Sequence, residues 1–116
     1  MVKMRAKVLA FGEVDAAGCM YLGPVDLSSV DPTLKVDFEY APVGRLLETE
    51  QDEDGVYATY EVRDEMSDLV PVAYLPMSGK QESPFKDVKL VKLGMVGMHE
   101  AILPPGFVWE RLDGRN

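Results

Sequence analysis

The feature that most constrains the fold is a pair of β-rich runs, residues 43–50 and 56–63, joined by a short polar loop. The loop, residues 51–55, ends in Gly55, and glycine can adopt the positive φ that often closes a hairpin. The two runs and their spacing therefore predict an antiparallel β-hairpin in the middle of the chain.

Other segments have the period-two pattern of a strand with one buried face. Residues 3–11 alternate basic with apolar side chains, and residues 35–40 alternate charged with large apolar ones. The Pro-Pro-Gly sequence at 104–106 breaks the chain, after which residues 107–112 resume an extended pattern. Three further strands are expected at these places.

The remaining apolar runs are shorter or interrupted. Residues 72–77 predict an edge strand or an extended segment, because Pro76 cannot donate a ladder hydrogen bond. Residues 88–98 predict a strand whose glycines, such as Gly94, fit a bulge or a close backbone contact. Residues 63–70 allow one or two helical turns.

Composition limits the architecture. The chain has 116 residues, the usual size of one domain, and its eight prolines and ten glycines favour short elements. We predict a single β domain over residues 1–116, with 104–116 as an extended C-terminal arm. Its fold class is mainly β: a small closed or partly open antiparallel barrel or sandwich of about seven strands with at most one short helix.

Charge and hydropathy narrow the classes of partner. The net charge of −8 argues against nucleic acid, whose binding depends on Lys and Arg neutralising phosphates, and favours a basic or mixed-charge protein. No apolar run approaches the roughly 20 residues of a membrane helix, so we expect no membrane partner and a cytosolic place of assembly. The single cysteine, Cys19, leaves no internal disulfide or thiolate pair for zinc, and we expect no cofactor.

One metal motif occurs at the predicted hairpin tip. Glu50, Asp52, Asp54 and Glu61 have the spacing of an EF-hand calcium loop, apart from Glu at the first position. However, Glu61 lies in an alternating strand, which cannot turn its carboxylate back to the loop. The favoured interpretation is a solvated acidic turn, with a calcium-binding module as an alternative.

Catalytic residues are sparse. His99, the only histidine, is followed by Glu100 and is the candidate base of a residual serine-type hydrolase. No Gly-x-Ser-x-Gly motif accompanies it, and the serines at 67, 78 and 83 lie in expected turns. Whether the chain is an enzyme stays open, and these residues favour a binding role.

Trp109 and Phe107 follow the two prolines on the predicted arm and are candidate anchors for a partner protein. The alternative is that the last strand uses Trp109 to close the core, as buried tryptophans often do. The sequence leaves both interpretations open.

Four segments taken together carry a resemblance to a known family. Residues 10–18, 23–24, 43–48 and 52–57 resemble, in order and spacing, the prohead (capsid-maturation) proteases of tailed bacteriophages, and the resemblance covers roughly residues 3–97. It implies an opening strand that runs into a Gly- and Asp-bearing turn, a later strand ending near a catalytic histidine, and then a hairpin.

The chain departs from the family at both catalytic positions. Tyr40 stands where the family has its histidine, and Lys92 stands where it has its serine nucleophile. A tyrosine with a pKa of about 10 is no general base at neutral pH, and lysine cannot form the usual acyl-enzyme. The resemblance thus implies an inactive member, a non-enzymatic phage or prophage protein of capsid assembly. Its expected partners are other virion or capsid proteins, with a homo-oligomer left open, in the host cytoplasm during assembly or in the virion.

Overall fold

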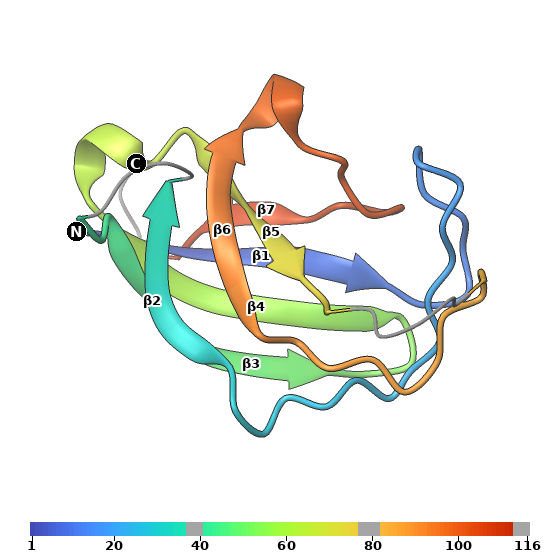
Figure 1. The fold of residues 1–116 in the computed structure, drawn as a ribbon. Coiled ribbons are helices and arrows are strands. Elements are labelled where there is room, and N and C mark those ends of the chain that lie inside the picture. Colours follow the sequence, from blue (N-terminus) through green and yellow to red (C-terminus); the bar gives the residue numbers. More distant parts are fainter. Residues whose placement is uncertain (37–40, 77–81, 113–116) are drawn as a thin grey trace.

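The structure of the protein, a computed structural model, describes residues 1–36, 41–76 and 82–112 (Figure 1). Its seven strands are β1 (Val2–Ala10), β2 (Asp31–Val36), β3 (Gly44–Gln51), β4 (Gly55–Val62), β5 (Leu69–Tyr74), β6 (Lys92–Gly97) and β7 (Trp109–Arg111). Two three-residue 3₁₀ helices, η1 (Asp64–Met66) and η2 (Met98–Glu100), follow β4 and β6. None of these helices is long and apolar enough to cross a membrane.

The strands form one curved sheet in the order β5-β6-β2-β3-β4-β1-β7, a half-barrel in which β5 comes back against β1 (Figure 1). The predicted class, a small partly open barrel of about seven strands, is confirmed. Two details differ. The sheet is mixed because β2 and β6 are parallel, and there are two short helices instead of one at most.

The parallel pair has a local cause. The segment before β6 runs beside the segment before β2 in the same direction, with parallel bridges between Tyr21 and Phe85 and between Asp26 and Lys89. The Asp31 N–H then donates to the Val91 carbonyl at 2.8 Å, where the two segments enter their strands. Two chain segments that travel together enter the sheet in parallel.

The predicted hairpin is confirmed as β3 and β4. The Asp52 carboxylate accepts hydrogen bonds from the N–H groups of Asp54 (2.8 Å) and Gly55 (3.2 Å), which shapes the turn. Gly55 is not among the glycines with positive φ, so the predicted reason for it was wrong. Glycine is required there because a Cβ would overlap the Leu9 carbonyl oxygen of β1.

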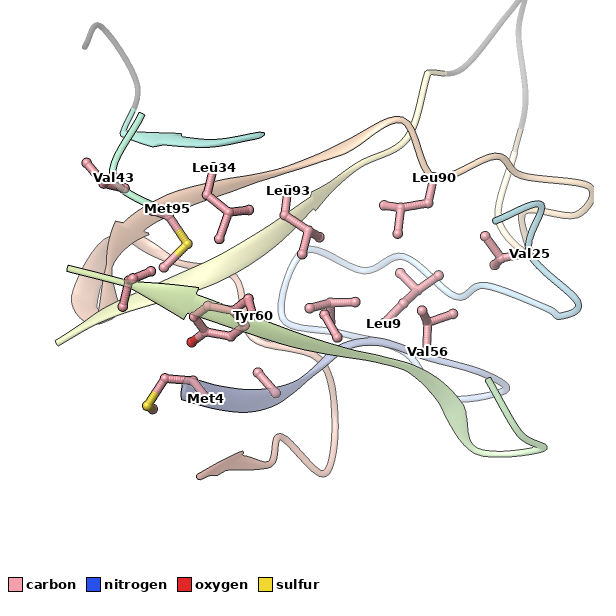
Figure 2. Packing of buried hydrophobic residues seen from close by; sticks show 14 of the residues in the cluster. Met4, Leu9, Val25, Leu34, Val43, Val56, Tyr60, Leu90, Leu93 and Met95 are labelled. Carbon is pink, nitrogen blue, oxygen red and sulfur yellow. The ribbon is translucent and has the colours of Figure 1, made fainter. Parts of the chain in front are cut away.

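The core lies inside the curve of the sheet (Figure 2). It contains one side-chain cluster from β1, β2, β4, β6 and the segments that join them: Val2, Met4, Ala6, Val8, Leu9, Val25, Leu34, Val43, Val56, Ala58, Tyr60, Val62, Val88, Leu90, Leu93 and Met95. The alternation of β1 is broken between Lys7 and Leu9 by a register shift, and both Val8 and Leu9 are buried. A bulge therefore lets β1 bury two consecutive apolar residues.

The less regular predictions were met in part. β5 is an edge strand as expected, but it starts earlier and contains Pro71. Gly94 makes the expected close contact, since a Cβ there would lie 2.5 Å from the Tyr74 ring. The predicted arm is partly a sheet strand, because β7 pairs with Met4–Ala6 of β1. Of the predicted strand at 35–40, residues 35 and 36 belong to β2, and 37–40 lie outside the described residues.

Candidate functional site

A pocket of about 470 Å³ lies on the open side of the half-barrel, where β5 approaches β1. Its walls come from residues 8–10 of β1, residues 71–74 of β5 and the adjoining Leu75, the loop at 13–21 and the segment at 100–105. Its volume falls within the range of 300–1,000 Å³ that is typical of ligand sites. It joins parts of the chain that are far apart in sequence, from Val8 to Pro105.

Two strands, β1 and β5, border the pocket along their edges. Alternate residues of a strand face opposite sides of a sheet, so a pocket over one face would be lined by every second residue. Here the lining is consecutive: four residues of β5 with Leu75 directly after it, and three residues of β1. The pocket therefore runs along strand edges, where backbone groups as well as side chains are in reach.

The walls are mostly apolar and the rim is acidic. Val72, Leu75 and Val96 are among the apolar wall residues. Glu13 and Glu100 lie on opposite segments of the rim, and both are exposed. No oppositely charged lysine or arginine lines this pocket within the part of the chain that the structure describes.

Asp15, the third carboxylate, is held in place by its own loop. Its Oδ1 atom accepts hydrogen bonds from the N–H groups of Ala17 (2.9 Å) and Cys19 (3.0 Å). These bonds form a tight Asx-type turn, and Gly18 supplies the positive φ of 82° that the turn requires. Asp15 therefore both organises the rim and adds negative charge to it.

Tyr21 lies at the base of this loop. Its ring packs against Phe85 with centroids 5.4 Å apart. Partial burial raises the pKa of the Tyr21 phenol, and nearby Cys19 and Asp15 raise it further. The phenol stays protonated across the physiological range and can act as a neutral hydrogen-bond donor.

The candidate base, His99, does not form a catalytic arrangement with the described residues. Its side chain is 86% exposed, and its Nε2 atom lies 3.7 Å from Glu100 Oε1. The Ser83 hydroxyl accepts the Met20 N–H at 2.9 Å, which is a structural role in the 83–85 turn. Its neighbour Glu100 lines the pocket, but His99 does not.

Two of the four candidate calcium ligands form ion pairs with arginine side chains. Glu50 forms a 2.9 Å ion pair with Arg5, and Glu61 forms a 3.0 Å pair with Arg45. Across residues 1–36, 41–76 and 82–112, no group of three or more His, Cys, Asp or Glu side chains is arranged to hold a metal ion. The four carboxylates are therefore not brought together.

The structure places the candidate partner anchors against the core. The Trp109 indole N–H donates to the Tyr60 hydroxyl at 3.0 Å, and both Trp109 and Phe107 pack half-buried on the core cluster. These contacts explain both aromatic residues by internal packing. A role for them in holding a partner stays a prediction.

Of the two positions taken from the protease resemblance, Tyr40 lies outside the described residues. Lys92 is exposed at the start of β6, and its Nζ atom lies 5.0 Å from the centroid of the Tyr74 ring. This is a cation–π contact next to the pocket, because Tyr74 is one of its lining residues.

Sequence reasoning missed the pocket. It identified β5 as an edge strand and noticed Glu100, but it did not connect either with Glu13 and Asp15. The Asp15-x-Ala17-x-Cys19 spacing was the local signal for the rim turn. No local pattern predicts that β1 and β5 are neighbours in space, because this depends on the order of the strands in the sheet.

Fold and pocket together define a small β protein, a seven-stranded half-barrel with an acidic-rimmed groove in its open side. Comparisons with the models of known protein families, with curated proteins and with solved structures find no match to the chain.

Proposed function

We propose that this chain is a non-enzymatic protein that binds a segment of another protein in the pocket between β1 and β5. The observation that carries the proposal is the composition of the pocket: apolar walls, with Glu13 and Asp15 from one loop and Glu100 from another segment among the lining residues. Such a site suits a ligand with apolar and positively charged groups. The net charge of −8 speeds the encounter with a basic partner.

The surroundings of the pocket favour a macromolecule over a small metabolite. Ile102 on its rim is 57% exposed, and so is Val14, which stands between Glu13 and Asp15. Met98, two residues before Glu100, is 38% exposed. Apolar surface that continues outside a cavity is typical of an interaction surface, since a small ligand would leave it in water.

The setting we propose is virion or capsid assembly in a tailed phage or prophage. Its support is the sequence resemblance to the prohead proteases, together with a β-rich fold. Lys92 at the serine position supplies no hydroxyl for an acyl-enzyme, which favours a binding role over proteolysis. The partners would then be coat, scaffold or other structural proteins of the particle.

The proposal can be tested by selecting displayed linear peptides on the immobilised protein. Ala101→Trp fills the pocket, and Ala41→Trp places the same side chain at an exposed site away from it. We expect a family of peptides that binds wild type and A41W but not A101W. No enrichment, or equal enrichment on A101W, would refute pocket binding.

The same selection tests the setting. Selected sequences that match coat or scaffold proteins of tailed phages would support virion assembly. Matches confined to other classes of protein would contradict it, while leaving the pocket as the binding site.

A further inference from the structure

We infer that the partner segment binds as an added β-strand along the free edge of β5, with basic side chains directed to Glu13 and Glu100. The inference rests on the proposed function and specifies how the pocket is used. It follows from which backbone groups of β5 and β1 face the pocket and from the charge around them.

The backbone groups of β5 alternate between the side that faces β6 and the opposite side. The Val91 N–H donates to the Tyr74 carbonyl at 3.0 Å, so residue 74 directs its backbone toward β6. Successive residues in a strand direct their N–H and C=O groups to opposite sides. Pro71 and Ala73 therefore face the free edge.

Pro71 supports the same assignment. Proline cannot donate in a ladder and is found in strands where its missing N–H would face away from the partner strand. Pro71 pairs in register with Met95 of β6, yet all of β5 from Leu69 to Tyr74 stays paired. The edge of β5 that no described strand pairs with thus carries the Pro71 C=O and both backbone groups of Ala73. Both residues line the pocket, Pro71 as a buried residue and Ala73 as a half-buried one.

The wall of the pocket opposite β5 is formed by the end of β1. β7 pairs with β1 only at Met4–Ala6, and one more hydrogen bond runs from Lys7 N–H to Val108 C=O at 2.9 Å. Beyond this point no described strand continues along that side of residues 8–10. These residues and residues 71–75 line the same pocket, so the seam of the half-barrel is bounded by two strand edges.

The negative charge around the pocket identifies the chemistry of the partner segment. The acidic side chains at 13 and 15 come from the loop after β1, and Glu100 comes from the segment after β6. An added strand sends alternate side chains to opposite sides, so basic residues reach the rim while apolar ones meet the walls. A second copy of this chain is a poor occupant, because each copy carries a net charge of −8.

The experiment uses fluorescein-labelled octapeptides and fluorescence anisotropy with the full chain. The probes are an alternating Lys-Val peptide, its Glu-Val counterpart, and two N-methylated versions of the Lys-Val peptide, methylated at odd or at even residues. N-methylation removes the N–H donors on one side of a strand and keeps every side chain. We expect the Lys-Val peptide to bind and the Glu-Val peptide not to bind. One methylation pattern should weaken binding by about tenfold or more, and the other should change it little.

Variants of the chain locate the edge. Ala73→Pro removes the edge N–H and should weaken the Lys-Val peptide by about tenfold, whereas Pro71→Ala adds an N–H and should keep or tighten binding. Circular dichroism checks that both fold. Glu13→Gln with Glu100→Gln should weaken binding several-fold, and Glu48→Gln on β3, outside the pocket, should not.

The outcomes separate the two proposals. If both methylated peptides bind like the parent while the Glu13 and Glu100 changes weaken binding, strand addition is wrong and pocket binding stands. If methylation matters but Ala73→Pro does not, the β5 edge is not the one used, which overturns the inference. If no peptide binds and the library selection is empty, the proposed function fails as well. A dimer in sedimentation equilibrium that Ala73→Pro dissociates would assign the edge to a second copy and contradict a basic partner.

Discussion

Replacing Tyr60 by phenylalanine tests how the last strand is attached to the core. Tyr60 is fully buried in β4, and its hydroxyl accepts the Trp109 indole N–H at 3.0 Å. The change keeps the ring and removes this hydrogen bond, while the half-buried indole N–H can still reach water. A bond of this kind contributes about 1 kcal/mol net. At neutral pH, Tyr60→Phe should therefore lower the free energy of unfolding by about 1 kcal/mol.

The same variant should behave differently in alkali. Burial raises the pKa of Tyr60 from 10 to about 12, and the bond from Trp109 opposes this shift only in part. Between these two values the unfolded chain has lost the proton and the folded chain keeps it, so stability falls as the pH rises. At pH 11 the loss amounts to about 1.4 kcal/mol in wild type and is absent in Tyr60→Phe. The two stabilities should converge near pH 11.

The assay is urea unfolding followed by circular dichroism at pH 8, 9, 10 and 11, with wild type and variant compared at each pH. Trp109→Phe is the matched control, because it removes the same hydrogen bond but leaves the tyrosine. Its stability should fall in alkali at least as steeply as that of wild type, since the bond lowers the pKa of Tyr60. A difference between wild type and Tyr60→Phe that is constant from pH 8 to 11 would refute the argument that burial holds the phenol neutral.

Further predictions concern the other candidate residues. Trp109→Ala should cost about 3 kcal/mol of stability and leave peptide binding by the folded fraction unchanged; lost binding at full stability would instead make Trp109 a partner anchor. Gly44→Ala should cost roughly 3 kcal/mol in urea unfolding, because its Cβ would overlap the Glu61 carbonyl oxygen, and a neutral effect would contradict that packing. Millimolar calcium should leave the melting temperature unchanged, whereas a clear rise would restore the calcium-loop interpretation. Neither wild type nor His99→Ala should turn over a generic peptide substrate, and turnover by wild type that His99→Ala abolishes would support the hydrolase alternative.

The elements that could be predicted are those specified by local physics. The 51–55 loop between two β-rich runs gave the β3–β4 hairpin, and the alternation after Lys3 gave β1. The edge position of β5 was predicted from Pro76, which lies after the strand; the strand itself contains Pro71. A proline is tolerated in an edge strand because its missing donor does no harm there. In each case the signal lies within about ten residues, the range over which periodicity and turn chemistry operate.

The features that could not be predicted depend on distant pairing. β2 and β6 pair in parallel because residues 21–31 and 85–91, which precede them, run side by side in the same direction. No sequence pattern in either segment predicts that it lies beside the other. Gly55 was correctly placed at the end of the hairpin loop, but the predicted reason for it was wrong. Glycine is needed there because a Cβ would overlap the Leu9 carbonyl oxygen of a different strand. The pocket depends on both kinds of information and was missed for that reason.

The incomplete closure of the barrel explains why an acidic rim would be useful. Exposed strand edges invite pairing with further copies of the chain, and proteins limit this with proline, short edge strands and charge. This chain has all three near its seam: Pro71 in β5, a β7 of three residues and the rim carboxylates. Charge differs from the other two because it discriminates among partners. The same carboxylates that repel a second acidic chain attract a basic segment, so one feature both keeps copies apart and selects the strand that the seam admits.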